Sequence, residues 1–251
     1  MNLNIADRKS SAAKTGQDAA AGPADAQSTS MVVTAYDRLL SMINDFQIRP
    51  GERVNEVAVA KKLGISRTPL REALNRLAIE GFLTVRAARG FFCRDLDPSE
   101  TMHLYELRAV IETAAVRLAC EKAEAHELAS LAQFLKSSSS ADDFPIDEQV
   151  AYDEGFHEEI VRLSGNTEML KLMKSLNQRI RPLRWIYLHR GRPTTQEEHR
   201  QILAALMAKD GDKAAELMRS HIMLRREEIE EAIRHIYGEI YVGRVSANKD
   251  G

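Results

Sequence analysis

Four residues in the second half of the chain have the types and the spacing to hold a metal ion. Asp153 and His157 stand four positions apart in YDEGFHEEI, so they share one face of a helix. His199 and His221 flank the turn KDGD, twelve residues before and ten residues after Gly211. At about 1.5 Å per residue, each histidine lies roughly 15–18 Å from the turn, so an antiparallel helix pair places both at similar depth. The pattern predicts that all four side chains can face one site.

One carboxylate and three imidazoles form a ligand set that suits zinc, nickel or manganese. The set contains no thiolate, which argues against a closed structural zinc site. Four protein ligands are fewer than an octahedral ion takes, so positions stay open for a small molecule. Each residue alone has an ordinary explanation, because a single histidine is more often a core or surface residue and Asp-x-x-x-His is often a simple helical pair. The prediction therefore rests on the whole set.

Arg108 falls within the apolar stripe of a helix expected over 101–120. A buried guanidinium needs a partner. The sequence offers two readings: an ion pair with Glu112, one turn further on, or a clamp for the carboxylate of a small-molecule effector. Arg181 and Arg184 are further candidates to line the same cavity. Both readings of Arg108 stay open at this point.

Helical periodicity supplies the elements that must position these residues. Between residues 99 and 240, apolar residues recur at intervals of three and four, interrupted at SSSSADDFP, SGN, RGRP and KDGD. The pattern predicts an all-α bundle of six helices, followed by a C-terminal tail at 241–251. The six helices are expected near 101–120, 123–137, 146–163, 167–190, 195–210 and 212–237.

The first hundred residues are organised differently. Residues 1–30 are mostly Ala, Ser, Gln, Asp and Gly, and we expect them to form a disordered tail. Residues 31–96 read as helix, short helix, tight turn, helix and two-stranded hairpin, which is the order of a winged helix-turn-helix. Residues 31–94 contain 11 basic and 6 acidic residues, whereas 99–240 contain 19 and 25. The basic segment indicates a binder of polyanions.

The third helix of this segment begins with SRTPLRE and carries side chains suited to DNA. Backbone amides at a helix N-terminus attract phosphate, and arginine suits both guanine edges and phosphate. A merely solvated basic face is the alternative, and the order of the elements favours DNA binding over it. The residues expected to contact DNA are Ser66, Arg67, Thr68 and Arg71 in the helix, and Arg89 and Gly90 at the tip of the wing.

The composition is that of an ordinary globular protein, with 251 residues, 44% of them hydrophobic and 29% charged, and a net charge of −2. No segment approaches the ~18 apolar residues of a membrane span. The N-terminal residues also lack the apolar core of a secretory signal. Cys93 and Cys120 are isolated, which argues against a disulfide scaffold. We therefore expect a cytoplasmic protein with no membrane association.

The segment VNEVAVAKKLGISRTPLREALNRLAIEGFLTVRAARGFF resembles the DNA-binding domain of the GntR family of bacterial transcriptional regulators. The resemblance implies that Arg67, Thr68 and Arg71 contact the operator, and that Arg89 and Gly90 lie at the wing tip. It also implies a mostly α protein, with the winged helix-turn-helix followed by an all-α effector domain.

The stretches LYELRAVIE, DEGFH, SGN and EEHRQILAALMAKDGDKAAELMRSHI are similar to the FCD effector domain of the FadR-like GntR branch, over about residues 100–235. Many members with this pattern bind a divalent metal through one aspartate and three histidines. The resemblance therefore implies the ligands Asp153, His157, His199 and His221, and it favours the effector-clamp reading of Arg108.

These observations predict a metabolite-responsive regulator, usually a repressor in this family, that binds double-stranded operator DNA as a homodimer. A small organic acid in the metal-containing cavity would control its operator affinity. One alternative is a metal-dependent enzyme, because an open metal can polarise a carbonyl or activate water. That reading leaves the winged helix-turn-helix unexplained and offers no separate general base. A third class, a constitutive architectural DNA-binding protein, would respond to no effector.

Overall fold

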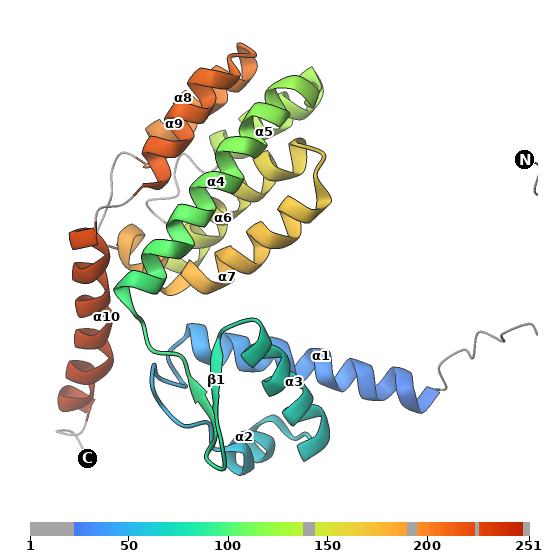
Figure 1. The fold of residues 1–251 in the computed structure, drawn as a ribbon, viewed down its shortest axis with the longest axis vertical. Coiled ribbons are helices and arrows are strands. Elements are labelled where there is room, and N and C mark those ends of the chain that lie inside the picture. Colours follow the sequence, from blue (N-terminus) through green and yellow to red (C-terminus); the bar gives the residue numbers. More distant parts are fainter. Residues whose placement is uncertain (1–22, 138–143, 190–194, 224–225, 248–251) are drawn as a thin grey trace, which may run out of the picture.

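The computed structural model is largely helical, and its described residues form ten helices and one two-stranded sheet. Two units follow one another along the chain and are stacked along the long axis of the molecule, the first coloured blue to teal and the second green to red (Figure 1). No helix in the described part of the chain is long and apolar enough to cross a membrane. The structure describes residues 23–137, 144–189, 195–223 and 226–247.

The first unit has the predicted order of a winged helix-turn-helix. Its elements are α1 (Pro23–Asn44), α2 (Glu56–Leu63), α3 (Arg67–Ile79), β1 (Leu83–Arg86) and β2 (Gly90–Cys93). Asn55 caps α2 by accepting a hydrogen bond from the backbone N–H of Ala58, and Gly64 ends the helix with a φ of 68°, which favours glycine. The strands pair antiparallel, with Leu83 opposite Cys93. The core of this unit includes the fully buried Leu39, Leu70, Leu74 and Leu77.

The second unit is an all-α bundle built around its first helix. Its elements are α4 (Pro98–Lys122), α5 (Ala125–Ser137), α6 (Ile146–Leu163), α7 (Thr167–His189), α8 (Thr195–Met207), α9 (Gly211–Ile222) and α10 (Arg226–Ala247). Helix α4 packs against α6, α7 and α9, while α8 and α9 pair with each other and α10 lies against α4 and α7 (Figure 1). Cys120 of α4 and Cys93 of β2, in the first unit, are both free and buried. The largest fully buried side chains here include Phe156, Ile160, Ile180, Ile202 and Leu206.

Two helices extend into segments that the sequence indicated as tails. Helix α1 begins at Pro23, so the expectation of disorder over 1–30 is wrong for its last residues, and residues 1–22 lie outside the described part. Helix α10 continues to Ala247, which corrects the expected tail at 241–251. Proline suits the first helical position, and a helix already fixed by packing gains one hydrogen bond for each residue added. Low apolar content over residues 23–30 therefore did not prevent α1 from beginning at Pro23.

The single helix expected over 212–237 is in fact two helices, so the second unit has seven described helices rather than six. Helix α9 ends at Ile222, and Met223 has an extended ψ of 115° before α10 begins at Arg226. No glycine or proline marks this break. Packing accounts for it, because α10 turns away from α9 and buries residues such as Ile229 in the core beside α4 and α7.

Candidate metal centre and nucleic-acid interface

The four side chains predicted to ligate a metal lie together inside the second unit. Helix α6 contributes Asp153 and His157, α8 contributes His199, and α9 contributes His221. All four are buried, and one potential ligand atom from each lies within 4.8 Å of the others. The α8–α9 hairpin brings the Nε2 atoms of its two histidines to 3.2 Å from each other. Counting residues from the turn had predicted this equal depth.

The separations between these atoms suit ligands arranged around a divalent ion. His157 Nε2 lies 3.1 Å from His221 Nε2, and Asp153 Oδ1 lies 3.5 Å from His199 Nε2 and 3.9 Å from His157 Nε2. At metal–ligand distances of about 2.1 Å, adjacent ligands are about 3.0 Å apart in an octahedral site and about 3.4 Å apart in a tetrahedral one. The site is therefore compatible with a metal, and its dimensions do not select one ion.

Two carboxylates determine which nitrogen of each imidazole faces the site. Glu112 Oε2 lies 2.5 Å from His157 Nδ1, and Glu198 Oε2 lies 2.7 Å from His221 Nδ1. An ionised carboxylate only accepts hydrogen bonds, so each Nδ1 carries the hydrogen and each Nε2 presents a lone pair. These lone pairs face each other at 3.1 Å, which is repulsive without a cation between them. Carboxylates commonly orient metal-bound histidines in this way, so the residues present fit a metal ion.

Burial keeps two imidazoles of the site, those of His157 and His199, neutral. Desolvation, reinforced by the charge of Arg108, holds the pKa of His157 well below its ordinary value, and desolvation lowers the pKa of His199 to about 3. Burial acts to raise the pKa of Asp153, but the charge of Arg184 and the nearby imidazoles outweigh it and hold that pKa below the usual range. Near neutral pH, Asp153 therefore offers a carboxylate and His157 and His199 offer neutral imidazoles, which are the forms that bind metals.

Two buried arginines border the site, and each is only partly satisfied. Arg108 donates from Nε to Glu112 Oε1 at 2.5 Å, so the predicted ion pair exists, and Arg184 Nε lies 2.6 Å from Asp153 Oδ2. The Nη2 atoms of both arginines are buried and have no hydrogen-bond partner among the described residues. Both arginines line a small cavity, together with Asp153 and His221. The cavity thus presents unused donors beside the candidate ligands.

Sequence reasoning missed the residues that hold the ligands in place. Glu112 was considered only as a partner of Arg108, yet it also anchors His157, which is 45 positions away on another helix. Glu198 directly precedes the candidate ligand His199. Its contact with His221, on the other helix of the hairpin, could not be predicted from residue spacing. Arg181 does not line the cavity, and instead its Nη1 lies 2.5 Å from Glu154.

The residues of α3 that were predicted to contact DNA are all exposed; they are Ser66, Arg67, Thr68 and Arg71. Arg67 and Arg71 line a concave surface together with the segment 52–57. This surface also includes the exposed Arg53, which the sequence analysis did not single out. Arg71 Nε lies 3.4 Å from Glu56 Oε2. The Arg71 side chain is 63% exposed, so this ion pair is weak and Arg71 remains available to bind another anion.

The hairpin carries two exposed arginines beside one aromatic ring. The guanidinium of Arg86 lies 4.1 Å from the centroid of Phe92, and that of Arg89 lies 5.8 Å from it. Gly90 opens β2 with a φ of 85°, a conformation that favours glycine. The tip therefore presents positive charge on a tight turn, as a DNA-contacting wing requires.

Two family profiles match the chain, and their limits agree with the two units. "Bacterial regulatory proteins, gntR family" matches residues 32–93, and "FCD domain" matches residues 103–224. The first covers the winged helix-turn-helix, and the second covers the helices that carry the candidate metal ligands.

Curated relatives match the chain over most of their length. The chain is 44% identical to the Nta operon transcriptional regulator of Aminobacter aminovorans, over 80% of this chain and 95% of that protein. It is 30% identical to the HTH-type transcriptional regulator YdhC of Bacillus subtilis, over 81% and 91% respectively. The HTH-type transcriptional repressor GlaR of Escherichia coli is 26% identical, over 81% and 99%.

Solved structures support the fold. The Escherichia coli protein McbR/YncC superposes with a TM-score of 0.62 at 24% identity, over 83% of this chain and 98% of that one. Lar of Listeria monocytogenes gives 0.55 at 20% identity, over 81% and 96%. The curated relatives described above are all named as regulators or repressors, so the metal-dependent enzyme is not supported. The chain belongs to the GntR family of bacterial regulatory proteins, in the FadR-like branch with an FCD domain, and is a transcriptional regulator.

Proposed function

We propose that this regulator is a homodimeric repressor whose affinity for double-stranded operator DNA is controlled by a small organic acid bound at a metal ion. One observation carries the proposal: four convergent ligand atoms and two unsatisfied guanidinium nitrogens meet at the same small cavity. A metal with open positions attracts an anionic oxygen, and arginine donates directional hydrogen bonds to carboxylates. A carboxylate complements both features.

The residues that would hold the ion are Asp153, His157, His199 and His221. Zinc, nickel and manganese all accept this set of donors. When bound, the ion supplies a Lewis-acidic centre for an oxygen of the effector. Arg108, through its free Nη2, would donate to the acid group of the effector while its Nε keeps the ion pair with Glu112.

The operator-binding surface in this proposal is the N-terminal part of α3 together with the wing. Ser66, Arg67, Thr68 and Arg71 would enter the major groove, and Arg89 and Gly90 would approach the neighbouring backbone. A homodimer would bind a pseudo-palindromic operator with one such surface in each half-site. The name of the Escherichia coli repressor above supports repression. A cytoplasmic location accords with a chromosomal target.

The test is a DNA-binding titration with the full chain. An operator is first selected from random double-stranded DNA, and its affinity is then measured by fluorescence anisotropy against a panel of small organic acids. We expect at least one acid to weaken binding about tenfold, a coupling of about 1.4 kcal/mol. Chelation, or the double substitution His199→Ala and His221→Ala, should remove this response. Operator affinity that no acid and no chelator changes would contradict the proposal.

A further inference from the structure

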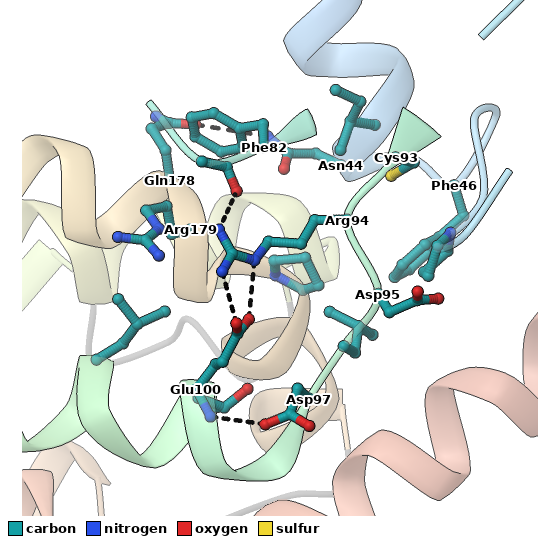
Figure 2. A pocket seen from close by; sticks show the side chains of 17 residues that line it. Asn44, Phe46, Phe82, Cys93, Arg94, Asp95, Asp97, Glu100, Gln178 and Arg179 are labelled. Carbon is teal, nitrogen blue, oxygen red and sulfur yellow. Dashed lines mark hydrogen bonds and ion pairs between the residues drawn. The ribbon is translucent and has the colours of Figure 1, made fainter. Parts of the chain in front are cut away.

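A second pocket lies where the two units meet, away from the candidate metal site (Figure 2). Its walls come from the end of α1, the start and end of the hairpin, the linker into α4, and one face of α7. Most of the surface is apolar. The apolar side chains that line it include Ile43, Phe46, Phe82, Leu96, Leu104 and Pro182.

An ion pair occupies one side of this pocket. Arg94 donates from Nε to Glu100 Oε2 at 2.8 Å and from Nη2 to Glu100 Oε1 at 2.6 Å, so both carboxylate oxygens are used. Its remaining nitrogen, Nη1, points to the carbonyl oxygen of Gly81 at 3.5 Å. Glu100 is therefore fully engaged by Arg94, as the dashed lines in Figure 2 show.

Arg179 of α7 is the second cation in the pocket. It makes no hydrogen bond or ion pair with any described residue, although its guanidinium packs close to Gly81. Burial, together with repulsion from Arg94, lowers the pKa of Arg179 from its ordinary value, although attraction to Glu100 acts in the opposite direction. A half-buried guanidinium beside another cation is a site that favours an added anion.

We propose that this interdomain pocket binds a small organic anion with an apolar body. The acid group pairs with Arg179, and the hydrocarbon or aryl part packs against Phe82 and Leu104. Small-molecule sites commonly combine apolar walls with a few polar groups that fix orientation, and they occur preferentially between domains. Because the walls belong to both units, the bound anion stabilises this arrangement of the DNA-binding unit on the effector unit.

Isothermal titration calorimetry with 2-naphthoate tests the proposal, with the neutral 2-naphthalenemethanol as the matched ligand. We expect naphthoate to bind the wild-type chain with one site, and the alcohol to bind roughly tenfold or more weakly, because a charged hydrogen bond is lost. Arg179→Met should weaken naphthoate binding to a similar degree. Arg179→Lys keeps a cation at the same place and should give an intermediate affinity.

Two controls separate this site from general charge effects and from the metal cavity. Lys174→Met removes an exposed positive charge from the same helix and should leave naphthoate binding unchanged. Chelation should also leave it unchanged, because the pocket contains none of the candidate metal ligands. Absence of naphthoate binding at about 1 mM, wild-type affinity in Arg179→Met, or loss of binding on chelation would each overturn the proposal.

Discussion

Removing the metal should lower the thermal stability of the regulator by a predictable amount. The proposed ligands join α6, α8 and α9, and without a cation the lone pairs of His157 and His221 face each other at 3.1 Å inside the core. An ion present at about 1,000 times its dissociation constant stabilises the folded state by about 4 kcal/mol. For a chain of this size, 1 kcal/mol corresponds to about 2–4 °C in Tm. Chelation should therefore lower Tm by about 8–16 °C, while the apolar core keeps the chain folded.

Elemental analysis and thermal melts on the same samples check this expectation. Wild-type protein should carry about one divalent ion per chain, and the double variant His199→Ala with His221→Ala should carry none and respond to no chelator. His126→Ala is the matched control, because His126 is 75% exposed and lies outside the cluster. Equal metal content in the wild type and the double variant, or an unchanged Tm after chelation, would refute the assignment of these ligands.

Three further outcomes are expected. Arg67→Ala and Arg71→Ala should each weaken operator binding by about 1–3 kcal/mol without changing Tm, because both side chains are exposed; unchanged affinity in both would remove α3 from the interface. Arg108→Met should abolish the response to the organic acid, which anisotropy measures; a retained response would contradict the role of Arg108 in binding the effector. The same change should lower the free energy of unfolding by about 3–5 kcal/mol, measured by thermal melts, because it leaves the buried Glu112 without its cation. The pKa of His199 is about 3 when folded and near 6.5 when unfolded, so the unfolded state binds more protons between these values. In metal-free protein His199 alone should therefore remove about 1.4 kcal/mol of stability per pH unit below about 6.5, and His157, whose pKa is also lowered, should add to this loss; denaturant titrations at several pH values measure it.

Local spacing explains why the candidate ligands could be found from the sequence. The helical repeat places Asp153 and His157 on one face, and the short turn between α8 and α9 fixes the relative depth of His199 and His221. Both relations involve neighbouring or directly connected elements. The winged helix-turn-helix was predictable for the same reason, because caps, turn residues and the hairpin all act within a few positions.

The residues that orient the ligands depend on packing between helices that are distant in sequence. Glu112 reaches His157 only because α4 packs against α6, and no periodicity encodes that pairing. The break between α9 and α10 is of the same kind. It contains no glycine or proline, so the continuous helical pattern was overridden by the tertiary position that buries Ile229.

Helix α7 shows that such contacts between distant helices also determine which residues belong to which functional region. Its apolar stripe, which includes Ile180, marks the core-facing side, and of its polar residues the sequence singled out only Arg181 and Arg184, as candidates to line the cavity beside Arg108. In the structure the polar residues of α7 have separate roles, because Arg184 pairs with Asp153 at the candidate metal site, whereas Gln178 accepts a hydrogen bond from Asn44 of the DNA-binding unit at 3.4 Å. One helix therefore contacts both regions, with Pro182 between the two contacts. Under the proposed function, an effector that displaces Arg184 acts on the same helix that contacts the DNA-binding unit, and this shared helix is where coupling between the two sites is to be tested.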